Sequence, residues 1–251
     1  MEGQLTNFLY RNPQLYDEVY ANSHHVDVQL CERAFDRYLG GMPTTLLDVG
    51  CGTGEDVAHF AAQGVDAVGV DLQPQMLERA AAKFPGARFV EADIRSLDLG
   101  RSFEAIISFG YAIANLHSDL DIAAALHSMA AHAKTSALLL LEALAFQPDT
   151  PLSLPSQFTI DTPGLRATAQ ARYEVDPGSR ILHRRRSWRD ESGVTTAEDF
   201  ARFRMLSPEE LELLLAAAGF ELLELHDREF PDGESLSSSV MVATSRYTGT
   251  P

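Results

Sequence analysis

Residues 46–54 form a glycine-rich turn that could hold a ligand containing a nucleoside. The segment reads Leu-Leu-Asp-Val-Gly-Cys-Gly-Thr-Gly, so an apolar strand is followed by glycines at alternate positions, Gly50, Gly52 and Gly54. Glycines remove the side chains from one face of a turn and let a ligand lie against the backbone. Asp48 ends the strand with a carboxylate that can hold a cationic or hydroxyl group of such a ligand.

The spacing of the glycines separates two classes of nucleotide ligand. Dinucleotide-binding turns follow G-x-G-x-x-G and place a pyrophosphate at the N-terminus of the next helix. This chain has G-x-G-x-G, and Glu55 occupies the position of the last glycine in the dinucleotide pattern. A carboxylate there would repel a phosphate, which favours a nucleoside without phosphates. Asp71 follows by roughly 20 residues, at the end of the next expected strand, where a carboxylate commonly binds ribose hydroxyls.

The chain resembles the class I S-adenosylmethionine-dependent methyltransferases in four segments that follow one another in the order of that family. These segments are residues 47–54, 68–71, 89–94 and 103–108. The resemblance extends over about residues 40–145 and implies S-adenosylmethionine as the cofactor. It implies that Gly50, Gly52 and Gly54 line the methionine part, near Asp48.

The same resemblance implies that Asp71 binds the ribose hydroxyls and Asp93 the adenine amino group. A tyrosine-rich N-terminal helix, with Tyr16 and Tyr20 on one face, resembles the helix that covers the cofactor in small-molecule methyltransferases; ordinary amphipathic packing is the alternative. The complete expected cofactor site is Tyr16, Tyr20, Asp48, Gly50, Cys51, Gly52, Gly54, Asp71, Leu72, Met76, Asp93, Ile94 and Ser108.

The loop after the strand at 103–109 is expected to meet the methyl acceptor. Its polar side chains are Tyr111, Asn115 and His117. Methyl transfer depends mainly on holding the acceptor against the methyl group, and a base is needed only if the acceptor arrives protonated. His117 could be that base because histidine titrates near neutrality, or it could be a loop residue preceding the helix cap Ser118.

Two clusters of basic or metal-binding side chains have competing interpretations. His24 and His25 are adjacent, and without a carboxylate cluster they cannot chelate one ion well, so no metal is expected. Arg184, Arg185 and Arg186, with His183 and Arg189 nearby, lie in an expected strand, where alternate residues face opposite ways. One or two of them could clamp a carboxylate or phosphate, although a solvated outer face is favoured.

The pattern of elements predicts an α/β fold. Alternating strands and helices over residues 44–145 predict a parallel, Rossmann-like sheet with helices on both faces, and the resemblance implies seven strands. Prolines over 148–163 mark an irregular connection, followed by antiparallel strands at 165–175, 180–190 and 194–205. We therefore predict a helical cap at 1–40, a cofactor-binding domain at 41–146 and 207–251, and a β lid at 147–206.

Composition excludes several classes of partner. The 251-residue chain has a formal net charge of −16, whereas proteins that bind nucleic acid normally present a basic face. Its N-terminus is polar and lacks a leader's apolar core, and no apolar run is long enough for a membrane span. Cys31 and Cys51 make no disulfide framework. We expect a cytoplasmic protein, compatible with a homodimer.

These features favour an S-adenosylmethionine-dependent methyltransferase that acts on a small molecule. The layout resembles the glycine/sarcosine and amino-sugar N-methyltransferases, and nitrogen is favoured over oxygen or carbon as the methylated atom. A nicotinamide-dependent oxidoreductase and a non-catalytic nucleoside-binding module are the alternatives.

Overall fold

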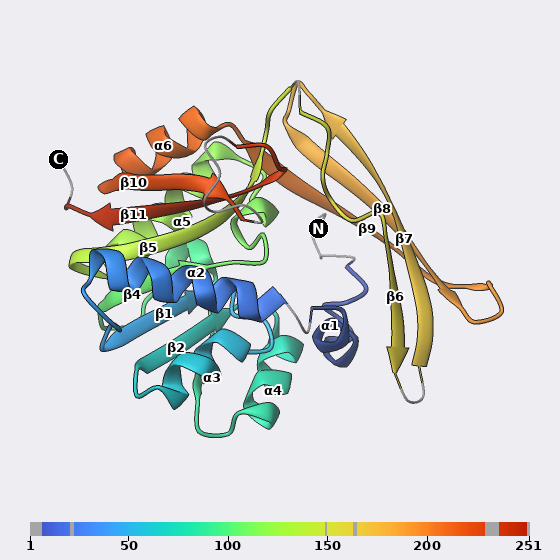
Figure 1. Ribbon diagram of the computed structural model, residues 1–251, viewed down its shortest axis with the longest axis horizontal. Coiled ribbons are helices and arrows are strands. Elements are labelled where there is room, and N and C mark those ends of the chain that lie inside the picture. The colour runs from blue at the N-terminus through green and yellow to red at the C-terminus, as the bar shows by residue number, and fades with distance from the viewer. Residues whose placement is uncertain (1–6, 21–22, 149, 163–164, 229–235, 250–251) are drawn as a thin grey trace.

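A mixed β-sheet forms the body of the molecule (Figure 1). The computed structural model describes residues 7–20, 23–148, 150–162, 165–228 and 236–249, and the polar N-terminal residues 1–4 lie outside these ranges. The body has the strand order β3-β2-β1-β4-β5-β11-β10, in which β1 to β5 run parallel and β11 runs antiparallel to β5. The predicted seven-stranded sheet is therefore confirmed.

The elements follow the predicted alternation. The helices are α1 (Pro13–Tyr20), α2 (Ser23–Tyr38), α3 (Glu55–Ala62), α4 (Pro74–Lys83), α5 (Asp119–Ala131) and α6 (Pro208–Ala217), with short 3-10 turns η1 (Ile94–Ser96) and η2 (Ile113–Asn115). The strands of the body are β1 (Thr45–Val49), β2 (Asp66–Asp71), β3 (Arg88–Glu91), β4 (Phe103–Ser108), β5 (Ala133–Ala145), β10 (Phe220–Asp227) and β11 (Val240–Tyr247). Those of the insertion are β6 (Gln157–Thr162), β7 (Leu165–Asp176), β8 (Ile181–Asp190) and β9 (Thr195–Leu206).

Helices cover both faces of the sheet because its central strands are apolar on both sides. On one face, α2 and α3 pack on a core that contains Phe35 and Phe60, and on the other, α5 and α6 pack on a core that contains Leu126 and Leu215. The helix starts follow the sequence signals: the Ser118 hydroxyl accepts the Asp121 N–H at 3.1 Å, and Ser207 forms a capping box with Glu210.

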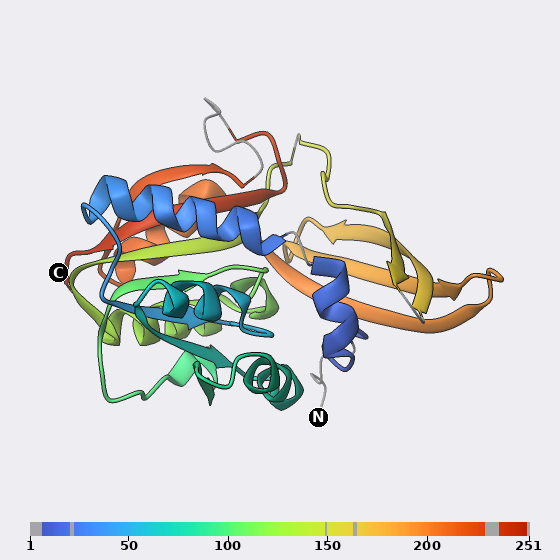
Figure 2. The ribbon, with the colours of Figure 1, turned by 60° about the horizontal axis from the view of Figure 1, so that its bottom comes forward.

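Strands β6 to β9 form an antiparallel insertion that extends away from the body (Figures 1 and 2). The ends of β5 and β9 pair in parallel at Leu144–Met205 and Ala145–Leu206, so the insertion is continuous with the sheet. The prediction of a wholly irregular connection over 148–163 was wrong, because β6 occupies part of it. Pro155 lies just before this edge strand, where a missing N–H group disturbs no ladder.

The carboxyl ends of β1 and β4 point toward the insertion, and α1 lies between the two (Figure 2). Asp17 of α1 accepts hydrogen bonds from Arg79 and Lys83 of α4, both at 2.8 Å, and Lys83 also pairs with Glu55 at 2.6 Å. These contacts fix α1 beside the glycine turn. Within the described ranges, no helix combines the length and apolar character needed to cross a membrane.

Candidate functional site

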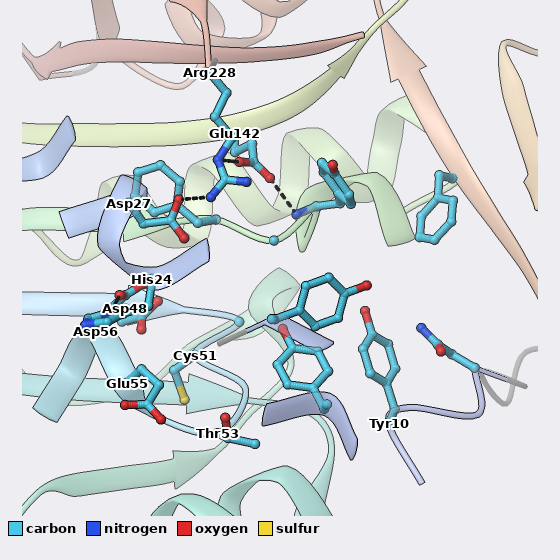
Figure 3. Close-up of a pocket in the computed structure, with 18 of the residues that line it drawn as sticks. Tyr10, His24, Asp27, Asp48, Cys51, Thr53, Glu55, Asp56, Glu142 and Arg228 are labelled. Carbon is cyan, nitrogen blue, oxygen red and sulfur yellow. Dashed lines mark hydrogen bonds and ion pairs between the residues drawn. The ribbon is translucent and has the colours of Figure 1, made fainter. Parts of the chain in front are cut away.

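A pocket opens between the glycine turn, α1, α2 and the insertion (Figure 3). It lies at the carboxyl edge of the parallel strands, where open α/β sheets bind their ligands. The residues that line it are Asn7, Tyr10, Tyr16, Tyr20, His24, Asp27, Asp48, Gly50, Cys51, Thr53, Glu55, Asp56, Phe109, Gly110, Tyr111, Glu142, Arg184, Phe203 and Arg228. Of the residues predicted from sequence, Tyr16, Tyr20, Asp48, Gly50, Cys51, Tyr111 and Arg184 meet there.

The glycine turn needs its glycines for two different reasons. Gly50, Gly52 and Gly54 all have left-handed backbones, with φ of 83°, 53° and 84°. A Cβ on Gly50 would come within 2.5 Å of Ala112, and one on Gly54 within 2.5 Å of Phe89, so both permit close packing. A Cβ on Gly52 would meet only the flexible ends of Met76 and Tyr16, at 3.5 Å or more. Among the three, Gly52 is the glycine at which a Cβ would meet no close contact, and Gly50 is the one that lines the pocket.

Asp71 braces this turn from the end of β2. Its carboxylate accepts the Gly52 N–H at 2.9 Å and the Gln73 N–H at 2.8 Å. Burial raises its pKa, and these N–H groups act in the opposite direction. A carboxylate fixed beside the glycine turn fits the ribose of a nucleoside, so the residues present are compatible with S-adenosylmethionine.

The other residues expected around the nucleoside are spread along the same edge. Met76 is buried beside Gly52, while Leu72 is 51% exposed. Asp93 caps η1 and pairs with Arg95 at 2.6 Å, which lowers its pKa, and Ile94 packs on the core. Ser108 is buried and donates to the Val49 carbonyl at 2.8 Å, joining β4 to β1. Their predicted cofactor contacts stay predictions.

Carboxylates dominate the pocket wall next to the glycine turn, which we call the acidic wall: Asp27, Asp48, Glu55 and Asp56. A further carboxylate, Glu142, lines the pocket beside Tyr111. Burial, followed by the charges of Asp56 and Asp71, raises the pKa of Asp48. Burial raises the pKa of Asp27 to about 8 against the opposing charge of Arg228. A cationic group, as an ammonium or a sulfonium would be, stabilises the ionised form of these carboxyl groups and is therefore favoured beside this wall.

The pocket wall formed by the insertion has the opposite character, and we call it the insertion wall. Arg184 is 7% exposed, stacks over Phe203 with its guanidinium carbon 5.2 Å from the ring centre, and pairs with Asp199 at 3.2 Å. Its Nε is buried and has no hydrogen-bond partner among the described residues. Arg186 also pairs with Asp199, at 2.9 Å, so this carboxylate serves both guanidinium groups.

The arginine run therefore divides as strand alternation predicts. Arg184 and Arg186 face inward and are buried, whereas Arg185 and Arg189 are exposed. A wholly solvated outer face, which the sequence favoured, is wrong for the inward pair. Trp188 is buried on the same inner side and donates its Nε1–H to Asp199 at 2.9 Å.

Tyrosines of the N-terminal segment cover the space between the two walls. The rings of Tyr16 and Tyr20 lie 4.7 Å apart, and those of Tyr10 and Tyr16 lie 6.1 Å apart. Burial raises the pKa of Tyr10 to about 12 and that of Tyr16 well above its usual range. Both hydroxyls therefore stay protonated and can donate hydrogen bonds at neutral pH.

The three residues predicted to act on the acceptor are placed differently from one another. Tyr111 lines the pocket with φ of 63°, and its ring meets Phe203 edge-on, with ring centres 6.4 Å apart. Asn115 is directed at the backbone, donating to the carbonyls of Tyr111 and Ala112 at 3.0 and 3.3 Å. His117 is exposed, and its Nε2 lies 3.1 Å from the Arg202 carbonyl oxygen. Neither Asn115 nor His117 lines the pocket, although the Asn115 side chain interacts with Tyr10, which does. The catalytic roles of all three residues stay predictions.

His24 is joined to Asp56 at the base of the acidic wall (Figure 3). The hydrogen bond that His24 donates to the Asp56 carboxylate raises the pKa of His24, while partial burial opposes it. His25 is exposed, and its ring centre lies 5.4 Å from that of His24. Over the part of the chain that the structure describes, no group of three or more His, Cys, Asp or Glu side chains could hold a metal ion.

Sequence reasoning missed Asp27, Glu142 and Arg228, which form one buried network. Glu142 is fully buried in β5, and its carboxylate lies 2.9 Å from the Arg228 Nε; Arg228 also pairs with Asp27 of α2 (Figure 3). Glu142 left one signal, since it interrupts the apolar run at 137–146. Asp27 and Arg228 are far apart in sequence, and nothing in the sequence indicates that they meet.

The sequence is similar to those of known methyltransferases. Residues 46–136 match the model of a methyltransferase domain. The chain is 34% identical over 99 residues to a dTDP-3-amino-3,4,6-trideoxy-alpha-D-glucopyranose N,N-dimethyltransferase of Streptomyces venezuelae, covering 39% of this chain but only 42% of that protein. It is 27% identical over 190 residues to a dTDP-3-amino-3,6-dideoxy-alpha-D-glucopyranose N,N-dimethyltransferase of Streptomyces fradiae, covering 71% and 70% of the two chains.

Structural similarity extends over nearly the whole chain. An amino pentose methyltransferase from Micromonospora echinaspora, solved with S-adenosylmethionine bound, superimposes with a TM-score of 0.76 at 25% identity. The superposition covers 97% of this chain and 99% of that one, so it includes the insertion as well as the sheet.

Proposed function

Since the chain belongs to the class I S-adenosylmethionine-dependent methyltransferases, we propose that it methylates the amino group of a small acceptor. One observation carries this proposal: the glycine turn opens into a pocket with an acidic wall on one side and Arg184 on the other. A cationic donor and an acceptor with an anionic end can face each other in such a pocket.

The cofactor is assigned to the side of the acidic wall. Asp48 would hold the methionine amino group, the turn around Gly52 its chain, and Asp71 the ribose. Bound there, S-adenosylmethionine supplies a methyl carbon that forms a bond to the acceptor nitrogen as its bond to sulfur breaks. The protein's part is to align the two reactants and exclude water, which Tyr16 and Tyr20 assist by covering the pocket.

The acceptor is assigned to the insertion wall. The Arg184 guanidinium offers a buried donor for a phosphate or carboxylate, and Phe203 and Tyr111 offer apolar faces to a sugar ring. The curated relatives carry dTDP-linked amino sugars in their names. A nucleotide-linked amino sugar would place its amine toward the acidic wall and its phosphates toward Arg184.

The geometry favours this function over the two alternatives. Glu55 stands in the first turn of α3 and pairs with Lys83, so its carboxylate occupies the place where a dinucleotide would need its pyrophosphate. A module that only bound a nucleoside would not need the further pocket that reaches from Gly50 to Phe203.

The proposal includes the partners of the protein and its location. A net charge of −16 disfavours nucleic acid as a partner, and a dissolved metabolite needs no membrane. We propose that the protein works in the cytoplasm, and a homodimer stays compatible with the insertion's exposed outer face.

Methyl transfer can be tested with a matched pair of acceptors. The protein is incubated with isotopically labelled S-adenosylmethionine and either dTDP-3-amino-3,6-dideoxyglucose or the same nucleotide sugar with a hydroxyl in place of the amine. We expect labelled, methylated product from the amine alone, detected by mass spectrometry. Equal labelling of the hydroxyl sugar would contradict N-methylation.

A further inference from the structure

Glu142 is a charged residue in the most apolar strand of the sheet. Its side chain is 0% exposed, and its neighbours in β5, Leu141 and Ala143, are buried as well. A buried carboxylate is costly unless a countercharge and hydrogen bonds compensate it. Its partners should therefore reveal what it does.

The partners of Glu142 are a cation and a backbone turn. Arg228 lies 2.9 Å away, and the Tyr111 N–H donates to Glu142 Oε1 at 3.2 Å. The Gly110 N–H also acts on the carboxylate, where it lowers the pKa of Glu142 against the effect of burial. Gly110 and Tyr111 both have left-handed backbones, with φ of 66° and 63°. Successive N–H groups in such a turn form a concave site for an anion, which here is filled by Glu142.

The turn held by Glu142 is one that its sequence disfavours. A left-handed backbone is unfavourable for tyrosine, which has a Cβ, and such strain persists only where the surroundings impose it. By accepting the Tyr111 N–H at the centre of the turn, the carboxylate supplies that constraint. The result is visible in the pocket, where Tyr111 stands between the end of β4 and Phe203 of β9.

We propose that Glu142 is a positioning residue for the methyl acceptor, because it fixes the Gly110–Tyr111 turn that joins the sheet to the insertion wall. This rests on the proposed methyl transfer. Loss of the carboxylate releases Tyr111, and with it the surface against which the acceptor is aligned. Arg228 keeps its pairing with Asp27, so α2 and the cofactor side remain in place.

The first test compares Glu142→Gln with Glu104→Gln. Glu104 is a matched control because it is also a strand glutamate that accepts a backbone N–H, from Thr44 at 2.6 Å, and pairs with Lys134 at 3.2 Å, but far from the pocket. For Glu142→Gln we expect kcat/KM for the acceptor to fall about 10- to 100-fold. The dissociation constant of S-adenosylhomocysteine should stay within about twofold of wild type, as should both constants for Glu104→Gln. A parallel loss of S-adenosylhomocysteine affinity in Glu142→Gln would overturn the proposal, because it would show a general structural effect.

A second test does not depend on the reaction. Hydrogen exchange of the full chain with S-adenosylhomocysteine present reports the protection of the Gly110 and Tyr111 amides. We expect Glu142→Gln to speed exchange in the peptide containing residues 110 and 111, and Glu104→Gln to leave it unchanged. Unchanged exchange in Glu142→Gln would refute the role of Glu142, whereas absent methylation by wild type would refute only the proposed function.

A third variant covers the case in which Glu142→Gln does not fold. Gly110→Ala leaves Glu142 intact and adds a Cβ with space around it, since its nearest neighbour is the Tyr16 hydroxyl at 3.8 Å. It disfavours the left-handed backbone at the same turn. We expect the same selective loss in the acceptor's kcat/KM, and wild-type kinetics would contradict the importance of the turn.

Discussion

The acidic wall and the insertion wall of the pocket differ in how they are built. The acidic wall comes from the carboxyl end of β1 and from the helices α2 and α3, and it carries an excess of carboxylates. The insertion wall comes from the long antiparallel strands β8 and β9, and its inward face carries Arg184 beside Phe203. One wall suits a cation and the other suits an anion.

The two walls supply different groups to their ligands. The sheet edge supplies backbone N–H groups and carboxylates that many nucleoside ligands can use. The insertion supplies a guanidinium that is buried and only partly satisfied, which is costly and is retained most readily where a ligand completes it. Variants on each wall should therefore affect different ligands.

The largest effect is expected from Asp199→Ala in the insertion. Asp199 accepts from Arg184, Arg186 and Trp188, so its removal leaves two buried guanidinium groups without their carboxylate. We expect the free energy of unfolding to fall by about 3–5 kcal/mol, measured by urea denaturation. Glu198→Ala, the exposed neighbour on the opposite face, is the control, and an equal loss there would show that the insertion tolerates no change at all.

Arg184→Met should separate the walls by function. Losing a charge-assisted hydrogen bond should lower kcat/KM for an anionic acceptor by an amount that corresponds to about 1.5–3 kcal/mol of transition-state stabilisation. The affinity for S-adenosylhomocysteine, measured by calorimetry, should not change. Arg185→Met, one residue away and facing solvent, should retain both properties. If the two variants behave alike, Arg184 does not contact the acceptor.

Asp71→Ala should give the complementary result on the other wall. It removes a carboxylate that braces Gly52 and is assigned to the ribose, so binding of S-adenosylhomocysteine should weaken by about 1–3 kcal/mol in calorimetry. Asp66→Ala, at the exposed start of the same strand, controls for loss of charge. Unchanged affinity in a folded Asp71→Ala protein would count against the ribose assignment.

The smallest effect concerns the pH dependence of the His24–Asp56 pair. Because Asp56 raises the pKa of His24, the pair's stabilisation is complete below the unfolded value of about 6.5 and is lost as pH rises through the raised value. His24→Asn should lower Tm at pH 6 and have little effect on it at pH 9. The corresponding loss in the free energy of unfolding at pH 6 should be less than about 1 kcal/mol. His25→Asn is the control; a Tm difference independent of pH would exclude protonation of His24 as its cause.

Sequence reasoning succeeded where a short segment determines its own structure. The glycine turn, the helix caps at Ser118 and Ser207, and the alternation of Arg184 to Arg186 all depend on neighbours in the chain. It failed at β6, because the prolines of this segment indicated a loop although the segment contains an edge strand. The orientation of His117 could not be predicted either, because η2 and a contact with β9 set it.

The network of Asp27, Glu142 and Arg228 lay beyond sequence reasoning for a physical reason. Arg228 reaches Glu142 because β11 pairs antiparallel to both β5 and β10, and Asp27 joins them because α2 packs across the sheet. Such proximity depends on the register of distant strands. A lone glutamate in an apolar strand predicts a buried partner without identifying it.

Calorimetric titration tests directly whether the pocket binds the cofactor of a methyltransferase or a dinucleotide. The purified protein is titrated with S-adenosylhomocysteine and, separately, with NADH. We expect saturable binding of S-adenosylhomocysteine and none of NADH, because the turn at Gly50–Gly54 is suited to a nucleoside while Glu55 opposes a pyrophosphate. Binding of NADH without binding of S-adenosylhomocysteine would contradict the assignment of the pocket and of the function built on it.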